Sequence, residues 1–423
     1  MASVTHSDSI IAENAARAET RFGPASCGYG TEGSGPQYEA WKELANYILE
    51  WFYDPDLEAI RMTYAAICAH YAVPDKPAWF FLLGDSGTGK TTLAIEPCKS
   101  ISRVNMLSDV TPKSFISGYK SSGKANVGLL QRGDASKSMI WLFQDFTSIV
   151  SLDQDTLLQV AKIFREVWDG STSKESASEG KVIWRGRVTA IAAGTPAVER
   201  HWQRFRHFGE RFITYRWQSP KDFSAAAKWV LRQAPHRSQI SKSLEERVFK
   251  IFDGTWLSGL TKNHLYTALP PELEQNLADS ATLAALLQTP VERDKRDAIR
   301  HVGNAEFPSR LIAAVQYMLK GHMILMGKSI PSMAEHRIAR RILLDSIPAY
   351  RRRILDAMPP DDFPLNRSQI QRLTGIPKAS IYSEVEELAA IGVLDVSSGK
   401  EPAIAWSKSF LDLRKKATFL QKV

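Results

Sequence analysis

The sequence contains little cysteine and no long apolar run. Its 3 cysteines among 423 residues, Cys27, Cys68 and Cys98, are too far apart for a disulfide framework or a zinc motif. Reduced thiols of this kind are typical of cytoplasmic proteins. No apolar run approaches the roughly 20 residues that cross a bilayer. The N-terminus lacks the basic start and apolar stretch of a secretory signal. These absences predict a cytoplasmic protein with no membrane partner.

The composition is that of an ordinary globular protein. Hydrophobic residues make up 44% of the chain and charged residues 24%, which excludes a disordered or fibrous protein. Lys plus Arg number 54 against 46 Asp plus Glu, a formal charge of +8. This modest excess permits a nucleic-acid partner without demonstrating one. The length suggests roughly two to three domains.

Short apolar runs alternate with helical patterns in the first half of the chain. Such runs, without polar alternation, are typical of strands buried on both faces of a parallel sheet. Their alternation with helices, such as one expected over residues 155–168, predicts a doubly wound α/β domain. The first two helices are expected to meet at Asp54-Pro55, with Asp54 as an N-cap. The expected strands are Trp79–Leu83, Val104–Leu107, Ser138–Phe143 and Val188–Ala193.

A glycine-rich segment follows the first of these strands and matches the P-loop pattern G-x-x-x-x-G-K-[ST]. Its glycines let backbone N–H groups surround phosphate oxygens, and the N-terminus of the next helix favours an anion. Lys90 is expected to neutralise the β- and γ-phosphates of ATP, and Thr91 to offer a hydroxyl to Mg²⁺. Pro97 is expected to end or kink the helix. The expected nucleotide-binding residues are Gly84, Asp85, Ser86, Gly87, Thr88, Gly89, Lys90, Thr91 and Thr92.

A second strand ends in a carboxylate that would suit Mg²⁺. Asp145 follows Ser138–Phe143 and is expected to act on the metal through water; the alternative is a helix N-cap. Many ATPases of this type place Glu next, to orient the attacking water, whereas this chain has Phe146. The base could be Asp109 at the end of another strand, Gln144 could position the water, or hydrolysis could be slow.

These motifs and their order make residues 79–350 resemble the AAA+ ATPase family. The segment Glu306–Leu311, the long helix after it and then Ile342–Pro348 are similar to the lid of minichromosome-maintenance-type helicases and related phage or plasmid ATPases. The resemblance implies an ATPase that assembles into a ring or spiral homo-oligomer, with a hexamer as the expected form. ATP would then lie between subunits.

The resemblance also implies roles for single residues. Thr195 takes the position of the sensor-strand tip, which touches the γ-phosphate and the lytic water; the alternative is a simple turn. Arg211 takes the position of the arginine that reaches a neighbour's ATP, with Arg204 and Arg206 as alternates. Arg310 matches the lid arginine that senses the γ-phosphate. For Arg211 and its alternates, a solvated surface charge is the other reading.

Residues 168–188 predict a hairpin just before the sensor strand. In the helicase branch such a hairpin projects into the ring pore, where a basic residue grips the DNA backbone. Lys174, Lys181 and Arg185 could do this by attraction to phosphates. The alternative is an exposed loop with scattered charges.

The C-terminal segment predicts a winged helix-turn-helix domain: two short helices followed by two strands around Ser397–Lys400. Lys378, Ser380, Tyr382 and Ser383, at the start of the second helix, would face DNA. Arg367, Arg372 and Lys400 could hold the backbone. Three glutamates make the rest of that helix acidic, which leaves a protein-docking role open. Arg351–Arg353 is expected to bind phosphate or to form a solvated face.

The sequence therefore predicts a P-loop α/β core with a helical lid and a winged helix domain. The leading hypothesis is an ATPase that acts on DNA as a helicase, translocase or loader. The alternative is an ATP-controlled assembly switch in replication, transposition or defence, with other proteins of those systems as possible partners; a small-molecule kinase fits less well. The expected parts are a flexible arm (1–36), a helical extension (37–78), the ATPase core (79–220), the lid (221–358) and the winged helix domain (359–423).

Overall fold

The computed structural model describes residues 33–116, 128–176, 180–200, 208, 211–253, 269–360 and 363–417. The contacts divide the chain into two compact units. The first comprises Met1–Ala268 and Gln316–Glu335, and the second comprises Leu269–Val315 and His336–Val423. The segment 221–358, expected as one helical lid, therefore contributes to both units.

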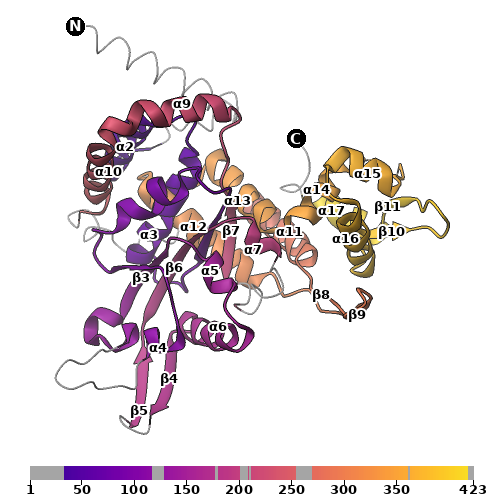
Figure 1. Ribbon diagram of the computed structural model, residues 1–423, viewed down its shortest axis with the longest axis horizontal. Helices are drawn as coiled ribbons and strands as arrows, with labels where there is room; N and C mark the ends of the chain where they lie inside the picture. The colour runs from indigo at the N-terminus through magenta and orange to yellow at the C-terminus, as the bar shows by residue number, and fades with distance from the viewer. Residues whose placement is uncertain are drawn as a thin grey trace. The chain divides into compact units, whose positions relative to one another are not determined.

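Five parallel strands form the central sheet of the first unit, in the order β2-β3-β6-β1-β7 (Figure 1). This confirms the α/β class with a parallel sheet. Because the strands are parallel, their carboxyl ends share one edge, where ligands of such sheets bind. Three strands have the expected bounds, one is slightly longer, and β7 was not expected. The strands are β1 (Trp79–Leu83), β2 (Val104–Leu107), β3 (Ser138–Phe143), β6 (Arg187–Gly194) and β7 (Phe212–Arg216).

Helices cover both faces of this sheet. Helix α3 (Leu57–Ala72) packs on β1 and β6 from one side, and α6 (Gln154–Trp168) packs on β6 from the other. Trp79 and Phe81 of β1 join the α6 residue Phe164 in a buried aromatic core. The remaining α-helices of this unit are α2 (Pro36–Trp51), α4 (Pro112–Phe115), α5 (Thr147–Val150), α7 (Ala197–Arg200), α9 (Phe223–Gln233) and α10 (Arg237–Phe252). Its short π and 3-10 turns are η1 (Thr91–Ile95), η2 (Glu96–Cys98), η3 (Leu129–Gln131), η4 (Gly133–Ser136) and η6 (Ala234–His236).

The N-cap expected at Asp54 is wrong. Helix α3 begins at Leu57, and Asp56 caps it by accepting a hydrogen bond from the Ala59 N–H at 3.0 Å. The other carboxylate oxygen of Asp56 accepts from the Gln218 N–H at 2.8 Å. The cap therefore also joins α3 to the segment that follows β7, a long-range contact that local spacing does not reveal.

The second unit is mainly helical. A small antiparallel pair, β8 (Val291–Arg293) and β9 (Ile299–Val302), follows its first helix. Helices α12 (Ser309–Leu325) and α13 (Met333–Ser346) each contribute residues to both units. Among the described residues, no helix combines the length and apolar character that would let it span a membrane. The other elements are α11 (Pro271–Leu287), α14 (Ala349–Ala357), α15 (Arg367–Thr374), α16 (Lys378–Ala390), β10 (Leu394–Val396), β11 (Ile404–Trp406) and α17 (Lys408–Lys416).

Candidate functional site

The glycine-rich loop leaves the carboxyl end of β1 in a conformation that depends on two of its glycines. Gly87 has φ +77° and Gly89 has φ +91°, values that L side chains rarely adopt. A Cβ added at Gly87 would meet no atom within 4 Å, so the backbone there faces open space. The loop can thus present its N–H groups to a ligand without side-chain obstruction.

Lys90 is buried beneath this loop. Its ammonium group donates hydrogen bonds to the carbonyl oxygens of Gly84 at 2.7 Å and Asp85 at 2.5 Å. Burial lowers the pKa of Lys90, and the nearby carboxylates of Asp85 and Asp145 oppose this effect. The two carbonyls are neutral and the Asp85 and Asp145 carboxylates offset the ammonium charge only in part, so the position suits an anion such as a phosphate.

A cavity of about 710 Å³ brings together seven of the nine expected nucleotide-binding residues, whereas Gly84 and Asp85 are not part of its lining. Residues Ser86–Thr92 of the loop line it. Gln144 and Asp145, which follow β3, and Thr195, which follows β6, line it as well. This convergence follows from the strand order, because β6 lies between β1 and β3 and all three strands end at the same edge. The volume lies in the range of ordinary small-molecule sites.

Asp145, Thr147 and Thr195 form a polar group on one side of the cavity. The Asp145 carboxylate accepts from the Thr147 N–H at 2.9 Å. The Thr147 hydroxyl lies 3.4 Å from both the hydroxyl and the backbone nitrogen of Thr195. Asp145 is thus held at the start of the short helix α5 and is still exposed, so its carboxylate can serve a metal as well as the helix start.

Phe146 explains why a glutamate does not follow Asp145. Its side chain is fully buried and packs against Phe143 and Phe208, with ring centroids 5.4 and 5.2 Å apart. This position therefore faces the aromatic core and away from the cavity. Of the two alternatives, Gln144 lines the cavity, whereas Asp109 follows the edge strand β2, which β3 and β6 separate from β1.

Two residues after β7 brace the loop, and sequence reasoning missed both. The Trp217 indole N–H donates to the Thr88 carbonyl at 3.1 Å, and the Ser219 hydroxyl donates to the Asp85 carboxylate at 3.0 Å. Both were missed because strand β7 was not expected from the sequence. The carboxyl end of β7 lies beside that of β1, with Arg216 opposite Leu83, and this brings the residues after β7 to the loop.

Aromatic residues from two distant segments line the rest of the cavity. Phe52 and Tyr53 follow α2, while Phe223 and Trp229 come from α9. The Tyr53 and Trp229 rings lie 6.0 Å apart, and the Trp229 indole N–H donates to the Trp51 carbonyl at 2.9 Å. An apolar aromatic wall of this kind suits a flat heterocycle. These residues carry no local motif, so the sequence alone did not single them out.

A magnesium ion would fit the residues beside the loop only with help from phosphate. Among the described residues, no group of three or more His, Cys, Asp and Glu side chains is arranged to hold a metal. Thr91 and Asp145 are the protein groups suited to Mg²⁺ here, and both line the cavity. This sparse donor set is typical of Mg²⁺ that is bound together with substrate phosphates.

Arg211 is placed differently from what an arginine finger requires. It precedes β7, at the sheet edge opposite the loop, and only 7% of its side chain is exposed. Its guanidinium lies 3.4 Å from the Asp169 carboxylate and stacks over Trp168. These contacts indicate a structural role within the chain, so we do not assign Arg211 as a finger. Its alternates, Arg204 and Arg206, lie outside the described residues.

The hairpin expected before the sensor strand is confirmed. Strands β4 (Ser171–Ser176) and β5 (Gly180–Arg185) pair in antiparallel register and extend beyond the sheet (Figure 1). Lys181 and Arg185 share one exposed face with Ile183, while Trp184 points inward. Lys174 pairs with Val182 in the register and therefore belongs to the other face, where it donates to the Ile116 carbonyl at 3.3 Å.

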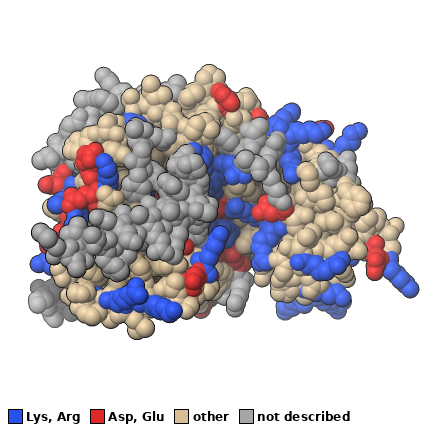
Figure 2. Space-filling view, turned by 90° about the horizontal axis from the view of Figure 1, so that it is seen from above, with Lys and Arg blue, Asp and Glu red and all other residues tan. Residues whose placement is uncertain are grey.

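In the second unit, α15 and α16 are joined by a tight turn and followed by the antiparallel pair β10-β11. Gly375 ends α15 with φ +64°, a conformation that favours glycine. Tyr382 is exposed, with the Arg367 guanidinium 4.3 Å and the Lys378 ammonium 6.0 Å from its ring centre. Ser380 is half-buried, and Lys400 is exposed between β10 and β11. Figure 2 shows Lys and Arg side chains gathered over the C-terminal part of the chain.

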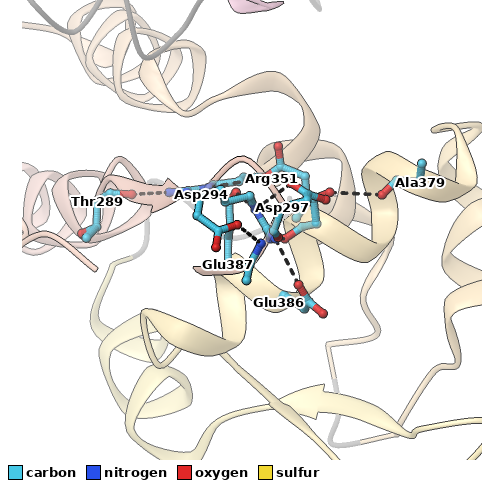
Figure 3. A network of polar contacts seen from close by, with 11 residues as sticks. Thr289, Asp294, Asp297, Arg351, Ala379, Glu386 and Glu387 are labelled. Atoms are coloured by element: carbon cyan, nitrogen blue, oxygen red, sulfur yellow. Dashed lines mark hydrogen bonds and ion pairs between the residues drawn. The ribbon is translucent and has the colours of Figure 1, made fainter. Parts of the chain in front are cut away.

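The acidic residues of α16 face arginines of the same unit (Figure 3). Glu387 pairs with Arg351 and with Arg293, each at 2.9 Å, and Glu386 pairs with Arg293 at 3.2 Å. The Glu384 carboxylate lies 3.5 Å from the Arg351 guanidinium. The three glutamates of α16 thus have arginine partners within the second unit, so their presence does not by itself indicate a protein-docking role.

The three residues Arg351–Arg353 differ in exposure and so form no continuous solvated face: Arg351 is buried, Arg352 is half-buried and Arg353 is exposed. Arg351 is 5% exposed and also donates to the Leu287 and Thr289 carbonyls at 2.9 and 2.7 Å. Arg352 pairs with Asp345 at 2.5 Å, and Arg353 donates to the Thr374 carbonyl. The three arginines hold the second unit together. Arg310, in the same unit, pairs with Glu306.

Comparisons with protein-family models and with curated proteins find no match for this chain. The choice of a function therefore rests on the residues and geometry of the chain itself.

Proposed function

We propose that the protein is an AAA+ ATPase that acts on DNA. The observation that carries this proposal is the single cavity that joins Lys90, Thr91, Asp145 and Thr195 from three adjacent strand ends. In it, the loop N–H groups and Lys90 would hold the β- and γ-phosphates of ATP, and the aromatic wall would receive the base. Thr91 and Asp145 would hold Mg²⁺, which when bound would neutralise charge on the transferred phosphoryl group.

Hydrolysis requires a positioned water, and two residues are suited to this task. Gln144 and Thr195 both line the cavity, and their amide and hydroxyl groups can orient a water by hydrogen bonds. A glutamine has this task in some P-loop enzymes. Neither group is a strong base, so hydrolysis would rely on positioning.

The DNA side of the proposal uses two separate surfaces. On the hairpin, Lys181 and Arg185 offer positive charge beside an exposed Ile183. On the second unit, Lys378, Tyr382 and Arg367 combine charge with an exposed aromatic ring, and we propose that α15, α16 and β10-β11 act as a winged helix. Salt-sensitive contacts to phosphates would supply most of the affinity. A ring or spiral of identical subunits is part of the same proposal.

A second candidate function is an ATP-controlled assembly switch with slow hydrolysis. The buried Phe146 favours it, because the position that would carry a glutamate next to Asp145 faces the core. In this case ATP binding would drive assembly and hydrolysis would reset it.

The experiment that separates these functions measures ATP turnover with and without single- and double-stranded DNA. Turnover stimulated by DNA and lost in Lys90→Ala would support the motor. ATP-dependent assembly with negligible turnover would support the switch. Turnover that ignores DNA would contradict both DNA-linked functions.

A further inference from the structure

The helix after the phosphate-binding loop is short and irregular. It begins with a π-helical turn, Thr91–Ile95, and ends in a 3-10 turn, Glu96–Cys98. In a regular α-helix the Leu93 carbonyl would accept from the N–H of residue 97. Residue 97 is proline, which has no N–H to donate. The irregular turn therefore needs another donor for the buried Leu93 carbonyl.

Tyr64 of α3 is that donor. Its hydroxyl donates to the Leu93 carbonyl at 2.8 Å, across 29 residues of sequence. The side chain is fully buried, and the rings of Trp41 and Phe252 pack edge-on against it with centroids 6.1 Å away. Burial raises the pKa of Tyr64 well above its ordinary value, so the hydroxyl keeps its proton at any working pH.

Leu93 connects this bond to the ligand cavity. Its N–H donates to the Gly89 carbonyl at 2.8 Å, and its side chain lies against Gly89 and lines the cavity. In the wide π turn, the Glu96 N–H donates a hydrogen bond to the Thr91 carbonyl. A shift of Leu93 would therefore move Gly89, Lys90 and Thr91 together.

We propose that Tyr64 is a positioning residue for the nucleotide site, since its hydroxyl replaces the main-chain donor that Pro97 removes. This inference rests on the proposed function, because it assumes that the loop binds ATP. Tyr64 lies outside the cavity lining, so its effect passes through the Leu93 carbonyl. A wide π turn at a functional site is a recognised feature of irregular helices.

The test is a double-substitution cycle in the full-length chain, with Mg²⁺-ATP binding measured by calorimetry. Tyr64→Phe should weaken ATP binding by about tenfold, the worth of one buried hydrogen bond. Pro97→Ala restores an N–H and should change affinity by no more than about twofold. Combined with Tyr64→Phe, it should return affinity to that of Pro97→Ala alone. Tyr71→Phe, on the same helix, is the matched control and should leave binding unchanged, because its hydroxyl donates to the Ser102 carbonyl.

Unchanged binding in Tyr64→Phe, or a loss that Pro97→Ala does not restore, would overturn the inference. Chemical unfolding without ATP gives a second readout, applied to the wild type, Tyr64→Phe, Pro97→Ala and the variant with both substitutions. Non-additive free energies of unfolding support the replaced bond, and additive ones contradict it. If the wild type binds no ATP, the proposed function is wrong, and the unfolding cycle still decides whether Tyr64 replaces the missing donor.

Discussion

Among single residues, Gln144 and Phe146, on either side of Asp145, bear most on the proposed hydrolysis of ATP. Gln144 faces the cavity, whereas Phe146 is part of the aromatic core. Residues 144 and 146 flank an exposed carboxylate, and the backbone turns helical at Phe146 (φ -79°, ψ -12°), so the two side chains do not share one face as they would in an extended strand. The chain therefore offers the cavity an amide at the position before Asp145, and the side chain after Asp145 packs in the core.

Gln144→Ala should lower the rate constant for ATP hydrolysis by about 100-fold, because the lytic water loses its positioning group. The dissociation constant for ATP should stay unchanged, since the amide has no role in holding the phosphates. Single-turnover hydrolysis and equilibrium binding measure the two quantities. Asp109→Ala is the matched control; if it abolishes hydrolysis while Gln144→Ala does not, the assignment is wrong.

At the scale of elements, the β4-β5 hairpin divides its charges between two faces. Lys181 and Arg185 share the exposed face, and Lys174 is turned toward the Ile116 carbonyl. The hairpin is anchored by Trp184, whose indole N–H donates to the Ser136 carbonyl at 2.8 Å. The exposed face also carries Glu175, which lies opposite Lys181 in the register, so Lys181 and Arg185 are the basic residues of a face with mixed charge.

Lys181→Ala or Arg185→Ala should each lower the slope of log affinity for DNA against log salt by about one, because each loses one phosphate contact. Basal ATP hydrolysis should not change. Fluorescence anisotropy with labelled DNA across a salt series measures the slope. Lys174→Ala and the exposed Lys242→Ala should leave the slope near that of the wild type; equal losses in all four variants would refute a specific hairpin contact.

A second element-scale feature is the charge network that fixes α16 to α14 and β8. Burial raises the pKa of Glu384 to about 7, against the opposing effect of Arg351. The neighbouring charges are Arg351 from α14, Arg293 from β8 and Glu387 from α16 itself. The folded protein therefore holds a proton on Glu384 more tightly than the unfolded chain does.

This raised pKa sets the sign of a pH effect. The contribution of Glu384 to stability is complete below its unfolded pKa and is lost as pH rises to about 7. Glu384→Gln should therefore stabilise the protein relative to wild type at pH 8, by on the order of 1 kcal/mol for each unit of pKa shift. The difference should vanish near pH 4. Thermal unfolding of both proteins from pH 4 to pH 8 measures it, and a difference that does not vary with pH would contradict the prediction.

The sequence predicted best where one local pattern decides the structure. The unbroken apolar runs at Trp79–Leu83 and Ser138–Phe143 gave strand bounds directly, and the loop after β1 was identified by residue types alone. Prediction failed where partners lie far apart in the chain. Arg351 is buried by Glu387, 36 residues later, and Asp56 is fixed as a cap by Gln218. No local spacing encodes either contact.

For the whole molecule, the formal charge of +8 is distributed differently from what the sequence suggested. Arg211 and Arg351–Arg353 are used for internal pairs. Lys181, Arg185 and Lys378 are among the exposed basic side chains that remain available to a polyanion. The rest of the proposal depends on one binding event, the entry of ATP into the cavity of the first unit.

Binding of Mg²⁺-ATP to the full-length protein and to Lys90→Ala, measured by calorimetry, tests this event most directly. We predict saturable binding to the wild type and a loss of affinity of roughly 10- to 100-fold in the variant, because a buried charge-assisted contact is removed. Lys137→Ala, an exposed lysine at the opposite edge of the sheet, should bind ATP as the wild type does. Absence of ATP binding in the wild type, or equal binding in Lys90→Ala, would contradict the proposed function.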